Sequence, residues 1–468
     1  MKKKIGLPSV VATGVGVVVA TSCLLTVGQG AGMLGSGFII AMIIGFVINS
    51  FFVSSVSELN ALMPNLTGGL AQYTLSCYGR FVTIVIISGG YLIGNAIVAS
   101  VECAMFGNAI TSIFPDCRLP SNFYSIVMIV ILMLVNYKGI DIFAKVQNVV
   151  AYGLIISVTI MGLIGIFKLG SGDIVQQPFI INNNINSILS LSGMAFFLFI
   201  ASEFIIPISS QIENPKRNVP RGMILSLLVI LIMQIILILG FKNYTLWEDL
   251  VKSTNPHVLY GANLLGNLGV VWMTVVTIFA VVSTVNSNIS GLSYLAQGMA
   301  KIDLLPNCLD KVNKNKAPYI SITLFGIFMI AINLVDLSSA SQIMFLVLCA
   351  CLFTMLAYIL VHLNVIILRK KLPKAPRTYK SPFGISLQVL GVIGVLWMMW
   401  NIDPSIEVKL KLYGLTAIVI GFISIYAFIW LKFIIKKPFF KALEIKEVLA
   451  MENEMYRQVR ESKKVNSK

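Results

Sequence analysis

The sequence predicts an all-α integral membrane protein with about twelve transmembrane helices. Hydrophobic residues make up 57% of the 468-residue chain and charged residues only 12%, whereas soluble proteins carry about 25% charged residues. About twelve apolar stretches are each long enough to cross a bilayer, which takes roughly 20 residues. We place these spans near residues 9–33, 36–61, 81–110, 122–138, 146–168, 188–212, 222–241, 268–300, 319–335, 342–366, 385–402 and 411–433.

The positions of the basic residues predict that both chain ends lie in the cytoplasm. With twelve spans, 29 of the 35 Lys and Arg residues fall on the side of the two termini, and six fall on the other side. Cytoplasmic loops of membrane proteins carry such an excess, so we expect a multi-pass protein of the inner (cytoplasmic) membrane. The basic residues are spread over many segments rather than gathered on one folded face, so we expect no nucleic-acid partner.

Two of the predicted spans contain residues that interrupt a membrane helix. In the first span, Gly14 and Gly16 weaken the helix and small or hydroxyl-bearing residues follow at 20–22; in the sixth span, Glu203 is followed by Pro207. Irregular backbone is tolerated at membrane depth only where it is buried in protein or lines a polar cavity. Two interrupted spans, five apart in order, favour a transporter with inverted repeats over ordinary close packing of small residues.

This organisation divides the chain into four parts. Two inverted five-helix repeats would occupy residues 1–168 and 188–366, with discontinuous helices 1 and 6. Two trailing helices, 11 and 12, would lie within 385–433, and a short cytoplasmic tail would occupy 434–468. The sequence leaves open whether the protein is a monomer or a homodimer.

Four segments resemble the amino acid–polyamine–organocation superfamily of transporters. They are the G-x-G and small-residue break of the first span, "SELNALMPNLTGGLAQYTLSCYG" at 57–79, the run at 196–221 that contains "ENPKRNVPR", and the eighth span with its loop at 282–319. The resemblance covers most of the first ten spans. It implies a bacterial amino acid permease or antiporter that works by alternating access.

The chain also departs from the pattern of that family. The family often has Gly-Ala-Gly at the first break, where this chain has Ala20-Thr21-Ser22. It commonly has Gly-Phe before the acid of the sixth span, where this chain has Ala201-Ser202, so an aromatic gate is missing. Some members carry a lysine in the fifth span for proton coupling, and residues 146–167 contain none.

The two breaks provide the candidate substrate site. Backbone N–H groups at the positive end of a half-helix suit the carboxylate of an amino acid, and free carbonyl groups in the sixth span suit its ammonium. We expect the carboxylate at Ala20, Thr21, Ser22 and Cys23, and the amine at Phe199, Ile200 and Ser202.

Two acids within the spans are candidates for coupling or gating. A carboxylate at the bilayer centre costs about 2.5–3.5 kcal/mol on insertion scales, so each acid should face a cavity or a partner. We interpret Glu203 as a residue that exchanges protons or holds the broken helix, and Glu102, toward the outer end of the third span, as a pocket or vestibule acid. A third acid, Glu58 near the inner end of the second span, is interpreted as structural.

The eighth span is unusually polar. If the fold is as predicted, Ser283, Thr284 and Ser287 form a possible ion site against the first span, although no carboxylate accompanies them. The cysteines and histidines show no metal-ligand spacing, and no nucleotide-binding or hydrolase motif occurs. We therefore expect no metal, no cofactor and no enzymatic activity.

The predicted function is secondary active transport of an amino acid across the lipid bilayer, by proton symport or by amino acid exchange. Because Glu102 and Glu203 could attract a cation, a polyamine or cationic amino acid antiporter is the alternative. A channel would show rings of charge or a repeated filter, and a non-transporting nutrient sensor would carry a large cytoplasmic extension. Both are kept as alternatives from a different class.

Overall fold

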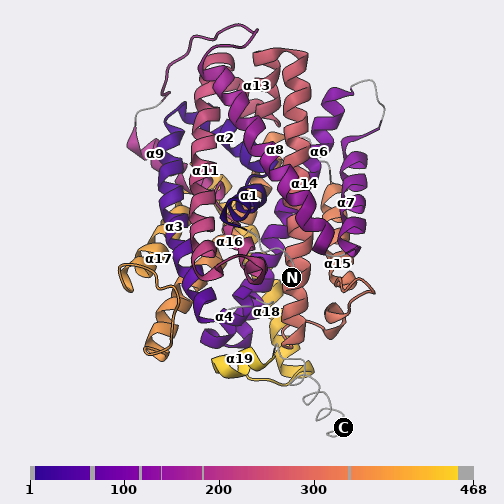
Figure 1. Ribbon diagram of the computed structural model, residues 1–468, viewed down its shortest axis with the longest axis vertical. Helices are drawn as coiled ribbons and strands as arrows, with labels where there is room; N and C mark the ends of the chain where they lie inside the picture. The colour runs from indigo at the N-terminus through magenta and orange to yellow at the C-terminus, as the bar shows by residue number, and fades with distance from the viewer. Residues whose placement is uncertain are drawn as a thin grey trace.

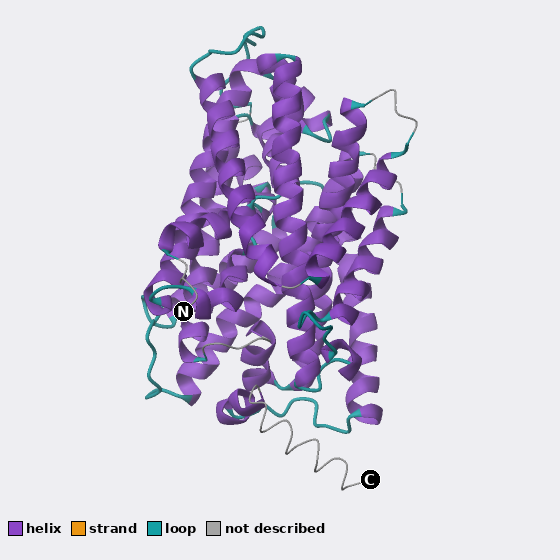
Figure 2. Ribbon diagram, turned by 45° about the vertical axis from the view of Figure 1, so that its right-hand side comes forward, coloured by secondary structure: helices purple, strands orange, loops and turns teal. Residues whose placement is uncertain are grey.

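The computed structural model describes residues 6–63, 69–114, 119–138, 140–181, 184–335 and 339–451. These residues form helices joined by short loops, as Figures 1 and 2 show, and the β-structure among them is one isolated bridge between Gly35 and Ile180. The predicted all-α class therefore agrees with the described part of the chain. The last part of the predicted tail, 452–468, lies outside the described residues.

The first half of the chain forms ten helices and a π-helical segment. They are α1 (Leu7–Val18), α2 (Thr21–Leu34), α3 (Phe38–Leu62), α4 (Gly69–Tyr78), α5 (Arg80–Thr83), η1 (Ile84–Leu92), α6 (Ile93–Ile113), α7 (Ser121–Tyr137), α8 (Ile140–Ile166), α9 (Ile185–Ser190) and α10 (Ser192–Phe197).

The second half begins with a 3₁₀ segment and continues with long helices. Its elements are η2 (Ser202–Gln211), α11 (Pro215–Tyr244), α12 (Trp247–Lys252), α13 (Pro256–Leu265), α14 (Asn267–Lys301), η3 (Asn307–Asp310), α15 (Tyr319–Asn333), α16 (Ala340–Lys371), α17 (Ser386–Trp400), α18 (Ile406–Ile429), η4 (Trp430–Ile434) and α19 (Ile445–Met451).

Each predicted span coincides with helical structure. Within the described residues, seven helical runs are long and apolar enough to cross a membrane, and the bent pair α1–α2 makes an eighth. Four shorter apolar helices fall on the remaining predicted spans: Ser121–Tyr137, Ser192–Ile206, Tyr319–Asn333 and Ser386–Trp400. The number of twelve crossings and the inverted repeats stay predictions.

The two interrupted helices lie inside the bundle. α1 is at the centre of the view in Figure 1 and packs against α8, α11, α14 and η2. α10 packs against α2, α3 and α17. Every residue of α2 except Met33 is buried, whereas the span that contains α18 is only 11% buried. The chain therefore surrounds the breaks with protein and presents other helices to lipid.

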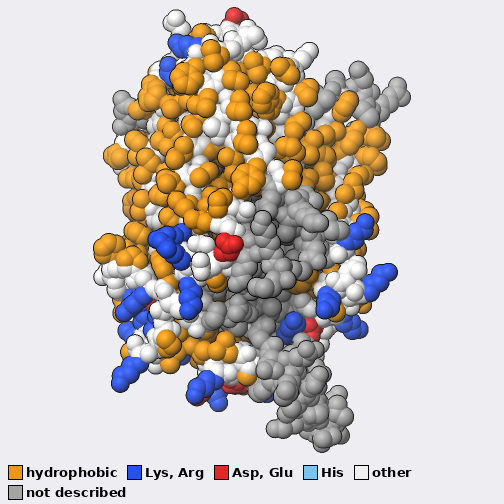
Figure 3. All heavy atoms as spheres, viewed as in Figure 1, with side chains coloured by type: hydrophobic (Ala, Val, Ile, Leu, Met, Phe, Trp, Pro, Cys, Tyr) orange, Lys and Arg blue, Asp and Glu red, His pale blue; other side chains and the backbone are white. Residues whose placement is uncertain are grey.

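The surface shows an apolar body with basic residues near one end. On the face drawn in Figure 3, hydrophobic side chains cover the upper and middle parts. Lys and Arg side chains gather toward the lower end, where α4 and α19 lie in Figure 1. An apolar exterior of this kind suits contact with hydrocarbon.

Some local structure differs from what the residues predicted. Gly14 does not interrupt α1; instead, a Cβ atom there would lie 2.5 Å from Ser226 Oγ of α11, so the glycine permits close helix packing. Pro215 occupies the first turn of α11, where its missing N–H has no cost. The segment between the predicted spans 222–241 and 268–300 contains two short helices, α12 and α13.

Candidate functional site

The first break separates α1 from α2. α1 ends at Val18, α2 begins at Thr21, and the two helices are bent by 68°. Val19 and Ala20 between them have extended backbone angles, with ψ of 93° and 165°. The break therefore lies at the N-terminal edge of the predicted substrate residues and leaves the N-terminus of α2 pointing into the protein interior.

A protein carboxylate occupies that N-terminus. The N–H of Thr21 donates to Glu102 Oε2 at 2.7 Å, and the N–H of Ser22 donates to Glu102 Oε1 at 2.8 Å. Glu102 comes from α6 and is fully buried. The backbone donors that we had assigned to a substrate carboxylate are thus already bonded to Glu102, which lies at the break itself rather than in an outer vestibule.

The second break lies between α10 and η2. α10 ends at Phe197 and η2 begins at Ser202. Ala201, just before η2, has a φ of 79°, a left-handed conformation that L-residues other than glycine rarely adopt. Its N–H donates to Tyr358 Oη of α16 at 3.1 Å. Such conformations persist only where surrounding contacts hold them and are frequent at functional sites.

Glu203 is held at this second break. Tyr358 Oη donates to Glu203 Oε2 at 2.8 Å, while Oε1 is buried without a hydrogen-bond partner. Tyr358 is itself fully buried and stacks on Phe52, with ring centroids 3.5 Å apart. One hydroxyl therefore holds both the strained backbone and the acid. Tyr358 was not among the residues predicted from the sequence, although it is the one tyrosine in the predicted tenth span, 342–366.

The other predicted residues of the sixth span are also in the interior. Phe199 is fully buried and meets Phe46 edge-on, at a centroid distance of 6.0 Å. Ile200 and Ser202 are buried as well. Because α10 contacts α2 and η2 contacts α1, the structure brings the two breaks into one region of the bundle.

The three residues of the possible ion site differ in their contacts. Ser283 Oγ donates to the carbonyl of Gly16 in α1, so the eighth span does reach the first, as expected. Ser287 Oγ donates to the carbonyl of Ser283 in its own helix at 2.7 Å, and Thr284 Oγ1 is buried without a partner. No group of three or more potential His, Cys, Asp or Glu metal ligands occurs in the described part of the chain. Binding of an ion here stays a prediction.

Glu58 lies in a buried ionic cluster at the end of α3. Arg369 donates to its two oxygens from Nε at 2.8 Å and from Nη2 at 2.6 Å. Arg377 Nε lies 3.2 Å from Oε1. The N–H of Ser381 donates to Oε2 at 2.8 Å, and its Oγ does so at 2.6 Å. These contacts tie the basic loop after α16 to α3.

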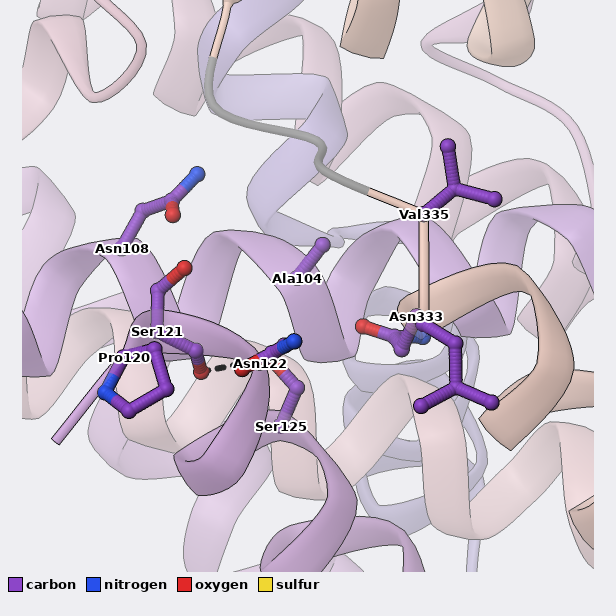
Figure 4. Close-up of a pocket in the computed structure, with 9 residues that line it drawn as sticks. Ala104, Asn108, Pro120, Ser121, Asn122, Ser125, Asn333 and Val335 are labelled. Atoms are coloured by element: carbon purple, nitrogen blue, oxygen red, sulfur yellow. Dashed lines mark hydrogen bonds between the residues drawn. The ribbon is translucent and has the colours of Figure 1, made fainter.

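A separate pocket of about 280 Å³ lies where α6, α7 and α15 meet (Figure 4). Asn108, Ser121 and Asn333 are among its lining residues, and none of the predicted site residues lines it. Ala104, which also lines it, is two residues after Glu102 and so about 200° around the helix. This pocket is therefore not the site at the two breaks.

Comparisons with known proteins identify the relatives of this chain. A family model described as amino acid permease matches residues 9–444. The branched-chain amino acid permease of Bacillus subtilis (strain 168) is 23% identical over 450 residues, covering 90% of this chain and 93% of that protein. The corresponding permease of Lactococcus lactis subsp. cremoris (strain MG1363) is 24% identical, covering 89% and 92%. The serine/threonine exchanger of Bacillus subtilis is 24% identical, covering 85% and 91%.

Proposed function

Because the chain belongs to the amino acid permease family, we propose that it carries amino acids, or amines closely related to them, across the cytoplasmic membrane by secondary active transport. The observation that carries this proposal is the pair of buried helix breaks. Each break is held by a carboxylate, Glu102 on the amides of α2 and Glu203 at the start of η2. Interrupted helices near the middle of a bundle form the substrate sites of transporters built from inverted repeats.

Alternating access fits the packing around the breaks. A second pocket, of about 680 Å³, is lined in part by Gln29 of α2 and Met344 of α16. Gln29 is seven residues, or about two turns, after Ser22 of the first break. This pocket lies about 10 Å along α2 from the break. If both chain ends lie in the cytoplasm, this pocket supports a route by which the substrate reaches the first break from the outside.

Glu203 is the proposed coupling residue. Its free Oε1 is an acceptor for a proton or for an ammonium group. The same geometry serves proton symport, with the acid loading and releasing a proton in each cycle, and exchange, with the acid only holding the break. The family and the geometry support both modes, and a flux measurement separates them.

Uptake into proteoliposomes tests the proposed function. Labelled amino acids and amines are offered with and without unlabelled compound inside, and with and without a pH gradient. Uptake that needs internal compound indicates exchange, whereas accumulation driven by the pH gradient alone indicates symport. Saturable counterflow argues against a channel, and binding without flux indicates a sensor. If no compound is taken up or bound, the proposed function is wrong.

For symport, Glu203→Gln is expected to abolish accumulation driven by the pH gradient and to leave counterflow measurable. Glutamine keeps the hydrogen bond with Tyr358 but cannot exchange a proton. The matched control is Glu407→Gln, because Glu407 is exposed and pairs with Lys411 one turn along its own helix. Full pH-driven accumulation by Glu203→Gln would show that the proton does not pass through this acid.

A further inference from the structure

The N-terminus of α2 has no backbone donor left for a substrate. The first four N–H groups of a helix lack partners within the helix. In α2, two of them are bonded to Glu102, at Thr21 and Ser22. The N–H groups of Cys23 and Leu24 donate to the carbonyl of Ala20, at 3.1 and 3.3 Å. A substrate carboxylate can bind these groups only if it displaces Glu102.

Displacement of Glu102 is costly. Its side chain is fully buried, and its neighbours Val101 and Cys103 are also fully buried. Moving the carboxylate off the amides would take a buried charge away from two of its hydrogen-bond donors, which is strongly unfavourable. Both oxygens accept N–H groups, which suits an ionised carboxylate with acceptor sites only. Glu102 is therefore a permanent part of the site.

The breaks carry more negative than positive charge. Neither Glu102 nor Glu203 forms an ion pair within the residues that the structure describes. A helix N-terminus offsets only about half an elementary charge. In addition, Glu203 Oε1 is buried without a hydrogen-bond partner, and the groups beside this carboxyl are the neutral hydroxyls of Tyr91 and Tyr358. A buried carboxyl group is either neutralised by a proton or paired with a cation, and the ammonium group of a substrate can supply that cation.

We propose that Glu102 takes the place of the substrate's α-carboxylate, so that the transported compound is an organic amine without that carboxylate, such as a decarboxylated amino acid. Its ammonium group binds between the two breaks, where Glu203 Oε1 offers an acceptor. A zwitterionic amino acid would bring a second carboxylate to amides that are already bonded. This inference rests on the proposed function, because it assigns the substrate class of the same site.

Matched pairs of compounds test the inference on the unmodified protein. Each pair is an amino acid and the amine formed from it by loss of CO₂: lysine and cadaverine, ornithine and putrescine, arginine and agmatine, leucine and 3-methylbutylamine. In proteoliposome uptake, we expect at least one amine to have a KM about tenfold or more below that of its parent acid. Parent acids that are carried better than every amine would overturn the inference and leave the proposed function intact. If neither class is carried, the proposed function fails.

Replacing Glu102 gives a second, independent measurement. Glu102→Ala frees the two amides of α2 and removes a negative charge, so the preference should shift toward the amino acid of each pair by about tenfold or more. Glu102→Asp, which keeps the charge on a shorter side chain, should still favour the amine. If Glu102→Ala lowers uptake of both compounds in equal proportion, Glu102 only caps the helix. Should this variant fail to fold, the comparison of pairs on the unmodified protein still decides.

Discussion

Glu58→Ala is expected to lower the free energy of unfolding by about 3–5 kcal/mol, the usual effect of removing one partner from a buried ion pair. The substitution leaves two nearly buried guanidinium groups, Arg369 and Arg377, without their carboxylate. It also removes the acceptor for the N–H and Oγ of Ser381. The loop after α16 would then lose its ionic attachment to α3. The change is measured by thermal unfolding in detergent, with the fraction of protein that stays monodisperse as the readout.

The chain offers a matched control for this prediction. Glu407 also pairs with a basic residue, Lys411, at 2.6 Å, but both side chains are more than 60% exposed. Exposed pairs of this spacing contribute only about 0.3–0.5 kcal/mol. Glu407→Ala should therefore leave the unfolding temperature almost unchanged. An equal loss of stability in the two variants would contradict the structural role of the buried cluster.

Tyr358→Phe is expected to reduce transport by about 10- to 100-fold while the protein still folds. The hydroxyl donates to Glu203 and accepts the N–H of Ala201. A hydrogen bond to a charged group is worth about 1.5–3 kcal/mol, and one factor of ten corresponds to about 1.4 kcal/mol. Without the hydroxyl, both the acid and the left-handed residue of the second break lose their support. The initial rate of counterflow measures the effect.

Tyr260→Phe is the control for Tyr358→Phe. Tyr260 is also fully buried, and its hydroxyl donates at 2.8 Å to the carbonyl of Met161 in α8, away from both breaks. Both substitutions remove the hydroxyl oxygen of a fully buried tyrosine. Any general effect on folding should therefore be the same in the two variants. We expect near-normal counterflow in Tyr260→Phe. A similar loss in both variants would show that the effect reports stability and not the site.

The helical content could be predicted because the hydrophobic stretches are long and the basic residues are unevenly placed. Local chemistry also located the first break, since the small and hydroxyl-bearing residues Ala20, Thr21 and Ser22 interrupt an apolar run at mid-span. The role of Gly14 was predicted wrongly, because a glycine that weakens a helix and a glycine that permits close packing have the same sequence signature. Only the contact with Ser226 separates the two.

The site could be predicted only in part, because its decisive contacts join residues that are distant in the chain. Glu102 is about 80 residues from the amides that it binds, and Tyr358 is 155 residues from Glu203. No spacing rule connects such pairs. The residues predicted to bind the carboxylate include Thr21 and Ser22, whose N–H groups bind Glu102, whereas the N–H groups of Ala20 and Cys23 donate to nearby backbone carbonyls. The sequence did not predict that a side chain of the same protein binds the N–H groups of Thr21 and Ser22.

The reactivity of Cys23 tests most directly whether the two breaks form the transport site. Cys23 directly follows the two amides that Glu102 binds and is buried in this structure. In a variant that keeps Cys23 and replaces the six other cysteines, membrane-impermeant thiol reagents are applied from either side of sealed vesicles. A variant that keeps only Cys308, which is exposed in η3, serves as the control.

We expect Cys23 to react from both sides, one conformation at a time, and the best-transported compound of the uptake panel to slow the reaction. The reaction of Cys308 should be unaffected by that compound. A Cys23 thiol that stays unreactive from both sides, or that reacts at the same rate with and without saturating compound, would place the substrate path away from the two breaks. It would show that the breaks do not form the transport site.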